Sequence, residues 1–258
     1  MGDASAQTGR SGSSASAGAD VDALMDQAQE ALESTSYFVA IALAEEALHL
    51  ARRHNDFARM ARICMPLLEG QRQVRQLATD AGSMFLARSA EEVPRPIAPG
   101  CYLVQPPLIG MDGRRLREVA CEHEIPVFVL TREPLTNAGQ WPIVGVGKEV
   151  TRVRLDPPEP LDVVKGSPSR DDWDKAPDAR WFVSAAERLG DQAIADAEKI
   201  AKGDPAAYLV DDLLDRLPGA PEHEKLHQRL MRACEQAANE PIPTTPRRRA
   251  VVDDPFSF

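Results

Sequence analysis

Residues 37–50, YFVAIALAEEALHL, carry the pattern that decides how the N-terminal part of the chain folds. Small and apolar residues recur there at intervals of three and four, as they do along one face of an α-helix. The stripe consists of Ala40, Ile41, Ala44, Ala47, Leu48 and Ala51. Because such small side chains let a second helix approach closely, the stretch predicts a helix from about Tyr37 to Arg53 that packs against an antiparallel neighbour.

Two further helices are predicted around this one. Asp20 is a candidate N-cap for the first, which should end where Ser34–Ser36 interrupts the helical spacing. The other should run from about Phe57 to Leu77 and contains Pro66. Because an interior proline removes a backbone hydrogen bond and costs about 3 kcal/mol, we expect this helix to bend or break near Met65.

The helices between Val21 and Asp80 resemble the tetratricopeptide family, in which repeats of about 34 residues pair two helices and usually bind other proteins. Ala40-x3-Ala44 carries the resemblance, at the place where the family has Ala-x3-Phe. The sequence departs from the family at Leu24 and Ala28 in the first helix, and at Arg52, near the expected closing proline. The resemblance implies a true repeat array or a helical bundle of similar character, with a groove for a partner's peptide.

After Gly100 the hydrophobic spacing changes from that of helices to that of strands. Two short apolar runs flank a helix expected at 113–124, and together they predict a βαβ unit with parallel strands. Two more strands should form a hairpin that turns at Gly147–Lys148. The four predicted strands are Cys101–Val104, Pro126–Leu130, Pro142–Gly147 and Val150–Leu155.

The chain as a whole is predicted to be a mixed α and β protein, mostly helical, with a sheet of about four strands and C-terminal helices near 184–202, 205–217 and 221–239. Changes in composition divide it into six segments. These are a disordered leader (1–19), the tetratricopeptide-like helices (20–90), a small α/β unit (98–160), an acidic linker (161–183), a C-terminal helical region (184–240) and a flexible tail (241–258).

Composition restricts the classes of function. The chain has 258 residues and a net charge of -10, which disfavours nucleic-acid binding because phosphates need a basic surface. No apolar run reaches the about 20 residues that a membrane span requires. The four cysteines are widely spaced and form no C-x-x-C pair, so we expect reduced thiols and therefore a cytoplasmic protein. No cofactor is predicted.

One stretch matches a metal-binding motif. His223-Glu224-Lys225-Leu226-His227 spells H-E-x-x-H, in which two histidines one helical turn apart bind zinc. The match begins just after Pro221, at the exposed start of a helix, and places Lys225 beside the metal position. Leu230 and Ala233 replace the glycine and third histidine of the extended motif. We therefore interpret the two histidines as part of an amphipathic helix and expect no metal.

Two other patterns of catalytic type fail on geometry. Cys121 and His123 cannot pair, because residues two apart on a helix point about 200° apart. Gly145-x-Gly147-Lys148 lacks the spacing of a phosphate-binding loop and is better explained as hairpin glycines. No catalytic residue is therefore predicted.

Candidate partner-binding residues lie in two places. Arginines on an otherwise acidic protein could receive an acidic peptide or an RNA backbone, although such a basic face is more often simply solvated. They are Arg52, Arg59, Arg62 and Arg72. The C-terminus ends in an acidic pair, a proline, Phe256 and Phe258, and it resembles the partner-recruiting tails of single-stranded-DNA-binding proteins.

The leading hypothesis is a non-enzymatic interaction or scaffold protein that binds an unidentified protein partner through its tetratricopeptide-like helices, with the C-terminal tail as a second candidate contact. The alternative is a small-ligand-binding protein or enzyme that uses the loops after the parallel strands, since ligands favour the carboxyl ends of such strands. Those loops are expected at Pro106–Asp112 and Thr131–Glu133. A less favoured variant of this alternative is an H-E-x-x-H metallohydrolase with His223 and His227 as metal ligands.

Overall fold

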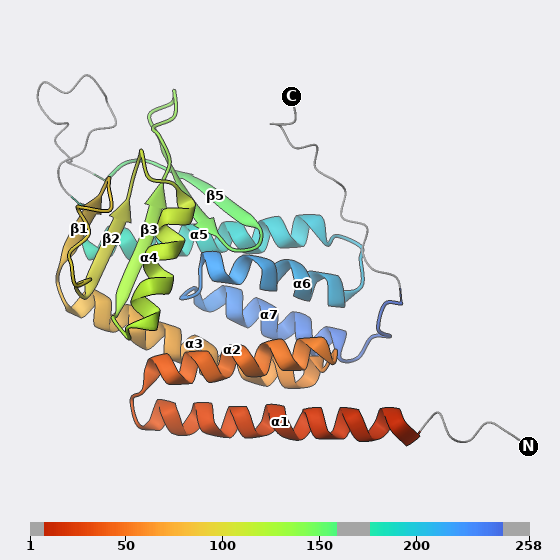
Figure 1. Cartoon of the computed structure of the whole chain (residues 1–258). Helices are drawn as coiled ribbons and strands as arrows, with labels where there is room; N and C mark the ends of the chain where they lie inside the picture. The colour runs from red at the N-terminus through yellow and green to blue at the C-terminus, as the bar shows by residue number, and fades with distance from the viewer. Residues whose placement is uncertain (1–7, 159–175, 245–258) are drawn as a thin grey trace, which may run out of the picture.

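The computed structural model describes residues 8–158 and 176–244. It begins with three consecutive helices, α1 (Thr8–Glu33), α2 (Tyr37–Arg53) and α3 (Phe57–Asp80), which run side by side along one edge of the molecule (Figure 1). Thr35 has a positive φ of 60° in the turn between α1 and α2. Asp56 caps α3 by accepting a hydrogen bond from the backbone N–H of Arg59 at 3.1 Å.

Two details of these helices differ from the expectation. Helix α1 already begins at Thr8, so Asp20 lies inside it instead of capping it, and residues 8–19 of the expected disordered leader are helical; residues 1–7 lie outside the described part. Helix α3 continues through Pro66 without a break. Ile63, three residues before the proline, and Leu67, directly after it, are buried in the helical core, and this packing offsets the lost hydrogen bond.

The β-sheet has five strands, in the order β1-β2-β3-β4-β5. The first three strands are parallel, and β4 and β5 are antiparallel to their neighbours. The bounds are β1 (Met84–Ala87), β2 (Gly100–Val104), β3 (Val127–Arg132), β4 (Trp141–Val146) and β5 (Val150–Leu155). Helix α4 (Gly110–Glu122) connects β2 to β3 and completes the expected βαβ unit. The mixed, mostly helical fold class is confirmed, and β1 is the strand that the sequence analysis missed.

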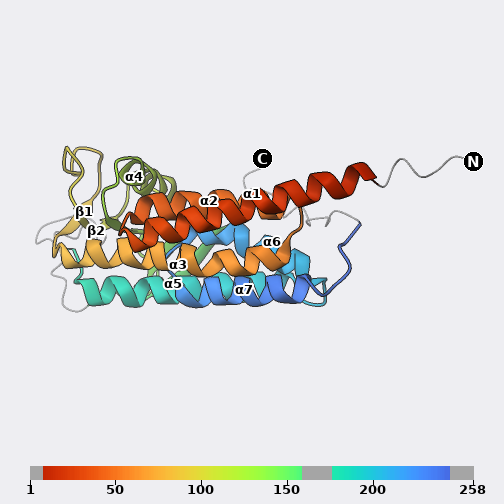
Figure 2. The same ribbon diagram turned by 90° about the horizontal axis from the view of Figure 1, so that it is seen from below.

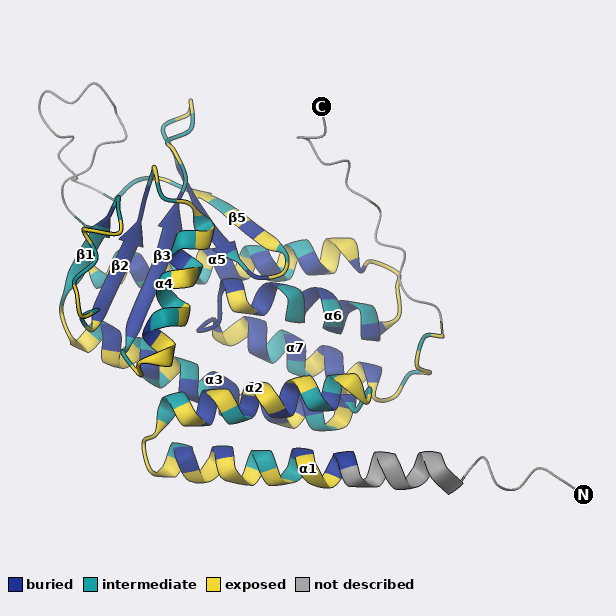
Figure 3. Ribbon diagram, in the orientation of Figure 1, coloured by how far each residue is buried: buried dark blue, intermediate teal, exposed yellow. Residues whose placement is uncertain are grey.

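The sheet is covered on both faces. Alternate residues of β2 and β3, such as Cys101 and Phe128, pack with Phe182 and Leu189 of α5 (Ala179–Ile200). The residues between them pack with Ala120 of α4 on the other face. Strands β2 and β3 are therefore buried along most of their length (Figure 3). Coverage of both faces explains why their sequences read as uninterrupted apolar runs.

Three helices close the described chain, as predicted: α5, α6 (Ala206–Arg216) and α7 (Glu224–Ala237), with a short 3-10 turn, η1 (Leu217–Gly219), before α7. Helix α5 begins at Ala179, five residues earlier than expected. Asp178 caps it by accepting from the N–H of Trp181 at 2.8 Å, and Trp181 and Phe182 pack against the sheet. Helix α7 lies beside α3, as Figure 2 shows from below.

The helical body and the sheet are joined by shared elements. Helix α3 contributes Met60 and Leu67 to the helical core and Ala78 to the sheet core. The hairpin between β4 and β5 also docks on the end of α6, where Lys148 and Glu149 donate backbone N–H bonds of 2.8 and 3.0 Å to the Asp215 carbonyl. This contact needs Gly147, because a Cβ there would collide with that carbonyl oxygen. Within the described residues no helix is long and apolar enough to cross a membrane.

Candidate binding groove

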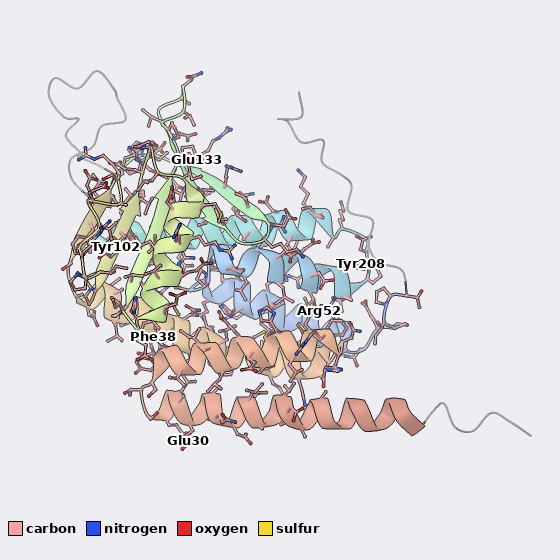
Figure 4. The ribbon with its side chains drawn as sticks, viewed as in Figure 1. Glu30, Phe38, Arg52, Tyr102, Glu133 and Tyr208 are labelled. Carbon is pink, nitrogen blue, oxygen red and sulfur yellow. The ribbon has the colours of Figure 1, made fainter. Side chains whose placement is uncertain are left out.

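A groove with a volume of about 700 Å³ lies between α2, α3, α4 and α6. Phe38, Ile41 and Leu48 of α2 and Leu67 and Val74 of α3 form much of one apolar side. Ile125, Val127, Leu214 and Leu217 contribute apolar surface from the rest of the chain. Phe38 and Arg52, labelled in Figure 4 toward opposite ends of α2, both line the groove, so it follows this helix for most of its length.

Helix α2 can pack in the helical core and line the groove at the same time, because different faces of the helix make the two contacts. Its four alanines, Ala40, Ala44, Ala47 and Ala51, are buried among the neighbouring helices. A second stripe at helical spacing, which shares Ile41 and Leu48 with the first, borders the groove and consists of Phe38, Ile41, Glu45, Leu48 and Arg52. Gly70 on α3 allows the two helices to meet, since a Cβ there would come within 2.8 Å of Ile41 Cγ1.

The cations of the groove are already engaged. Arg52 reaches from α2 to α6 and donates two hydrogen bonds, of 2.7 and 2.8 Å, to the Asp211 carboxylate. Arg114 donates to Glu118 at 2.7 Å, and Lys148 lies 3.3 Å from Asp215. The fourth cation, Arg117, donates to the backbone carbonyls of Pro218 and Val129 at 2.8 and 3.0 Å.

Glu45 is the unusual acidic group of the groove. Its side chain is exposed to solvent, and yet enough protein lies around it that desolvation raises the pKa of its carboxyl above the usual value. In the described part of the chain it has no hydrogen-bond or ion-pair partner. Its charge also acts on the exposed thiol of Cys121, whose pKa is raised first by desolvation and next by Glu45.

The structure separates the four arginines proposed as partner contacts. Only Arg52 borders the groove. Arg59 is held by Asp22, at 2.8 Å, and by Asp56, at 2.6 Å. Arg62 lies 3.7 Å from Asp22, and Arg72 bonds to Glu69 at 2.7 Å, one turn away on α3. Three of the four thus form local ion pairs, while Phe256 and Phe258 lie outside the described residues.

The two histidines of the H-E-x-x-H stretch are buried, contrary to the expectation of an exposed first turn. His223 is the N-cap of α7, and its Nδ1 accepts from the N–H of Leu226 at 3.1 Å. His227 donates from Nε2 to the Pro221 carbonyl at 2.7 Å, and desolvation lowers its pKa to about 4. Among the described residues no three His, Cys, Asp or Glu side chains are grouped to hold a metal ion. His223 and His227 therefore have a structural role, because both bond to backbone groups at the start of α7.

The carboxyl ends of the parallel strands, the alternative site, are filled by a side chain of the protein. Arg132, at the end of β3, is fully buried and donates to Gln105 Oε1 at 3.0 and 2.6 Å. Its guanidinium also lies 4.8 Å from the ring centroid of Trp141. Cys121 and His123 are both exposed near the end of α4, and Gly147–Lys148 is the turn of the β4–β5 hairpin, as predicted.

The sequence analysis missed most of the groove. Glu45, Arg117 and Asp211 come from three different helices, and only the fold brings them together. The second stripe of α2 was the available signal, because Phe38, Ile41, Glu45 and Leu48 share a face at intervals of three and four.

By its fold the chain is an α/β protein with a large helical body, and its site is an apolar groove with charged side chains along it. Comparison of the chain with protein-family models, with curated proteins and with solved structures gives no match.

Proposed function

We propose that this protein is a non-enzymatic adaptor whose groove binds an amphipathic helix of a partner protein. The observation that carries the proposal is the apolar groove of about 700 Å³ along the second stripe of α2. The tetratricopeptide-like helices, which were expected to receive a partner's peptide, provide one wall of this groove. The four free cysteines accord with a cytoplasmic location.

A helical occupant fits the walls better than an extended one. The groove is bordered mainly by helices, whose backbone groups are bonded internally, and by β3, which has a paired strand on each side. An extended peptide would therefore find few backbone partners, whereas a helix satisfies its own N–H and C=O groups. The path from Phe38 to Arg52 is about 21 Å at 1.5 Å per residue, so about 14 residues of a partner helix would fill it.

The apolar lining can supply the affinity that an adaptor needs. Each large aliphatic or aromatic side chain that is fully buried contributes roughly 1.5–3 kcal/mol. Three or four such anchors supply about 5–12 kcal/mol before the cost of association and ordering, so we expect dissociation constants of about micromolar or weaker.

The test begins with a displayed library of 15-residue helical peptides, selected against the full chain. The affinity of selected peptides is then measured by fluorescence anisotropy with two tryptophan variants on α4. Cys121→Trp places a bulky side chain in the groove, whereas Arg115→Trp places the same side chain on an exposed position that does not border it.

We expect Cys121→Trp to weaken binding at least about tenfold and Arg115→Trp to leave it within about twofold, because only the first occupies the space of the peptide. Equal binding by both variants, or a selection that yields no peptide, would contradict the proposal.

A small apolar ligand is the second candidate, and the groove's volume favours it because small-molecule sites typically measure about 300–1,000 Å³. Native mass spectrometry of the purified full chain distinguishes the two. A bound small molecule that Cys121→Trp removes, together with no peptide binding, would move the function to ligand binding.

A further inference from the structure

We infer that the partner helix carries a lysine or arginine that pairs with Glu45 at the middle of the groove, with an apolar residue one helical turn away on each side. This inference rests on the proposed function and specifies the chemistry of the occupant.

The first step is the balance of charges along the groove. Three of its four cations, Arg52, Arg114 and Lys148, have a carboxylate partner within the protein. The fourth, Arg117, donates only to backbone carbonyls and keeps its charge. Among the described residues, no hydrogen bond or ion pair is found for the carboxylates of Glu45 and Glu222, which also border the groove. The charge left for an occupant is therefore negative.

The second step concerns desolvation. A helix that enters the groove removes the remaining water from Glu45, whose carboxyl already has a raised pKa because of its surroundings. An apolar occupant would leave this carboxylate buried and unpaired, which is costly, whereas a cationic one compensates it. An acidic occupant would be repelled by Glu45 and Glu222, the two groove carboxylates without a partner among the described residues.

The third step gives the position of the cation. Glu45 lies midway between Phe38 and Arg52 along α2, with Ile41 one turn before it and Leu48 one turn after it. A cation that reaches Glu45 is thus flanked by apolar surface on both sides along the groove. On a partner helix that packs along α2, apolar side chains three or four residues before and after the cation would meet these surfaces, whichever way the helix runs.

The experiment uses the selected 15-residue peptides and the full chain. Enrichment of lysine or arginine at the central position, with apolar residues three or four places away, is the first expected result. The dissociation constant of one such peptide and of its Lys→Gln counterpart is then measured with wild-type protein, Glu45→Gln and Glu46→Gln. Glu46 is the matched control, because it is the next residue on α2, is exposed and does not border the groove.

We expect Glu45→Gln to weaken the lysine peptide roughly tenfold and to leave the glutamine peptide within about twofold, with Glu46→Gln close to wild type for both. Equal effects of Glu45→Gln on the two peptides would overturn the inference, as would selection of acidic or wholly apolar centres. If Cys121→Trp still abolishes binding in that case, the groove remains the site and only its charge preference was wrong. Failure to select any peptide would overturn the inference and the proposed function together.

Discussion

At the scale of single residues, the chemistry of the groove depends on how close Glu45 and Cys121 lie across it. Cys121 is exposed, whereas Cys64, Cys101 and Cys234 are buried. Burial and then the charge of Glu45 raise the pKa of the Cys121 thiol, so less of it is thiolate at a given pH than in an ordinary cysteine. The two residues line the groove from different helices, Glu45 from α2 and Cys121 from α4.

The rate of Cys121 modification therefore reports the geometry of the groove without any partner. With a thiol-reactive disulfide reagent at pH 8, we expect one reactive thiol in the native chain and four after denaturation. Glu45→Gln should speed the native reaction roughly two- to fivefold, because removing the nearby negative charge lowers the thiol pKa. Glu46→Gln should leave the rate unchanged. Equal rates in all three proteins would show that Glu45 and Cys121 do not interact.

At the scale of elements, α7 shows how burial gives an apparent catalytic motif a structural role. His223 and His227 occupy its first turn, and desolvation is the main cause that lowers the pKa of each. For His227, the pKa of about 4 in the folded chain lies below the ordinary value of 6.5. The unfolded chain therefore binds a proton more readily than the folded chain between these values. The contribution of the neutral histidine to stability is complete above about pH 6.5 and is lost as the pH falls toward 4.

This linkage predicts that the free energy of unfolding, measured with urea, falls by about 2 kcal/mol between pH 7 and pH 5 on account of His227. His227→Gln should reduce that pH dependence, whatever its stability at pH 7, because glutamine does not titrate. His123→Gln, a change at an exposed position of the chain, should keep the wild-type dependence. If His227→Gln and His123→Gln lose stability equally between the two pH values, His227 is not the buried neutral group that the structure implies.

Elements with a long, regular pattern could be predicted from the sequence, and short or exceptional ones could not. Helix α2 begins and ends where its spacing indicates, and β2 and β3 agree with their apolar runs to within a few residues. Strand β1 is a run of four apolar residues shortly after a helix, and so short a run fits a helix segment as well as a strand. Helix α3 passes through Pro66 because of core contacts that no local pattern reveals. The groove was missed for a similar reason, since its walls come from elements far apart in the sequence.

At the scale of the whole molecule, the division into separate segments suggested by composition contrasts with the continuity of the packing. Helix α5 places Phe182 and Leu189 in the sheet core and Ala193 and Ala197 in the helical core. Helix α3 likewise contributes to both cores, and the β4–β5 hairpin docks on α6. Neither core can lose its structure without removing part of the other, and the groove exists only while both are folded.

We therefore expect the helical body and the sheet to unfold together in urea, although chains longer than about 150 residues often populate intermediates. Far-UV circular dichroism follows mainly the helices. Fluorescence in a Trp173→Phe background follows the two other tryptophans, Trp141 and Trp181, which pack in the sheet core. Coincident midpoints are the expected result.

Gly147→Ala, which wedges the hairpin away from α6, should lower both midpoints by the same amount, since the contact it disrupts belongs to one cooperative unit. A fluorescence transition at lower urea than the dichroism transition would show a sheet that melts by itself. The groove would then lie between two separately folding units, and binding of a partner helix would have to hold them in place.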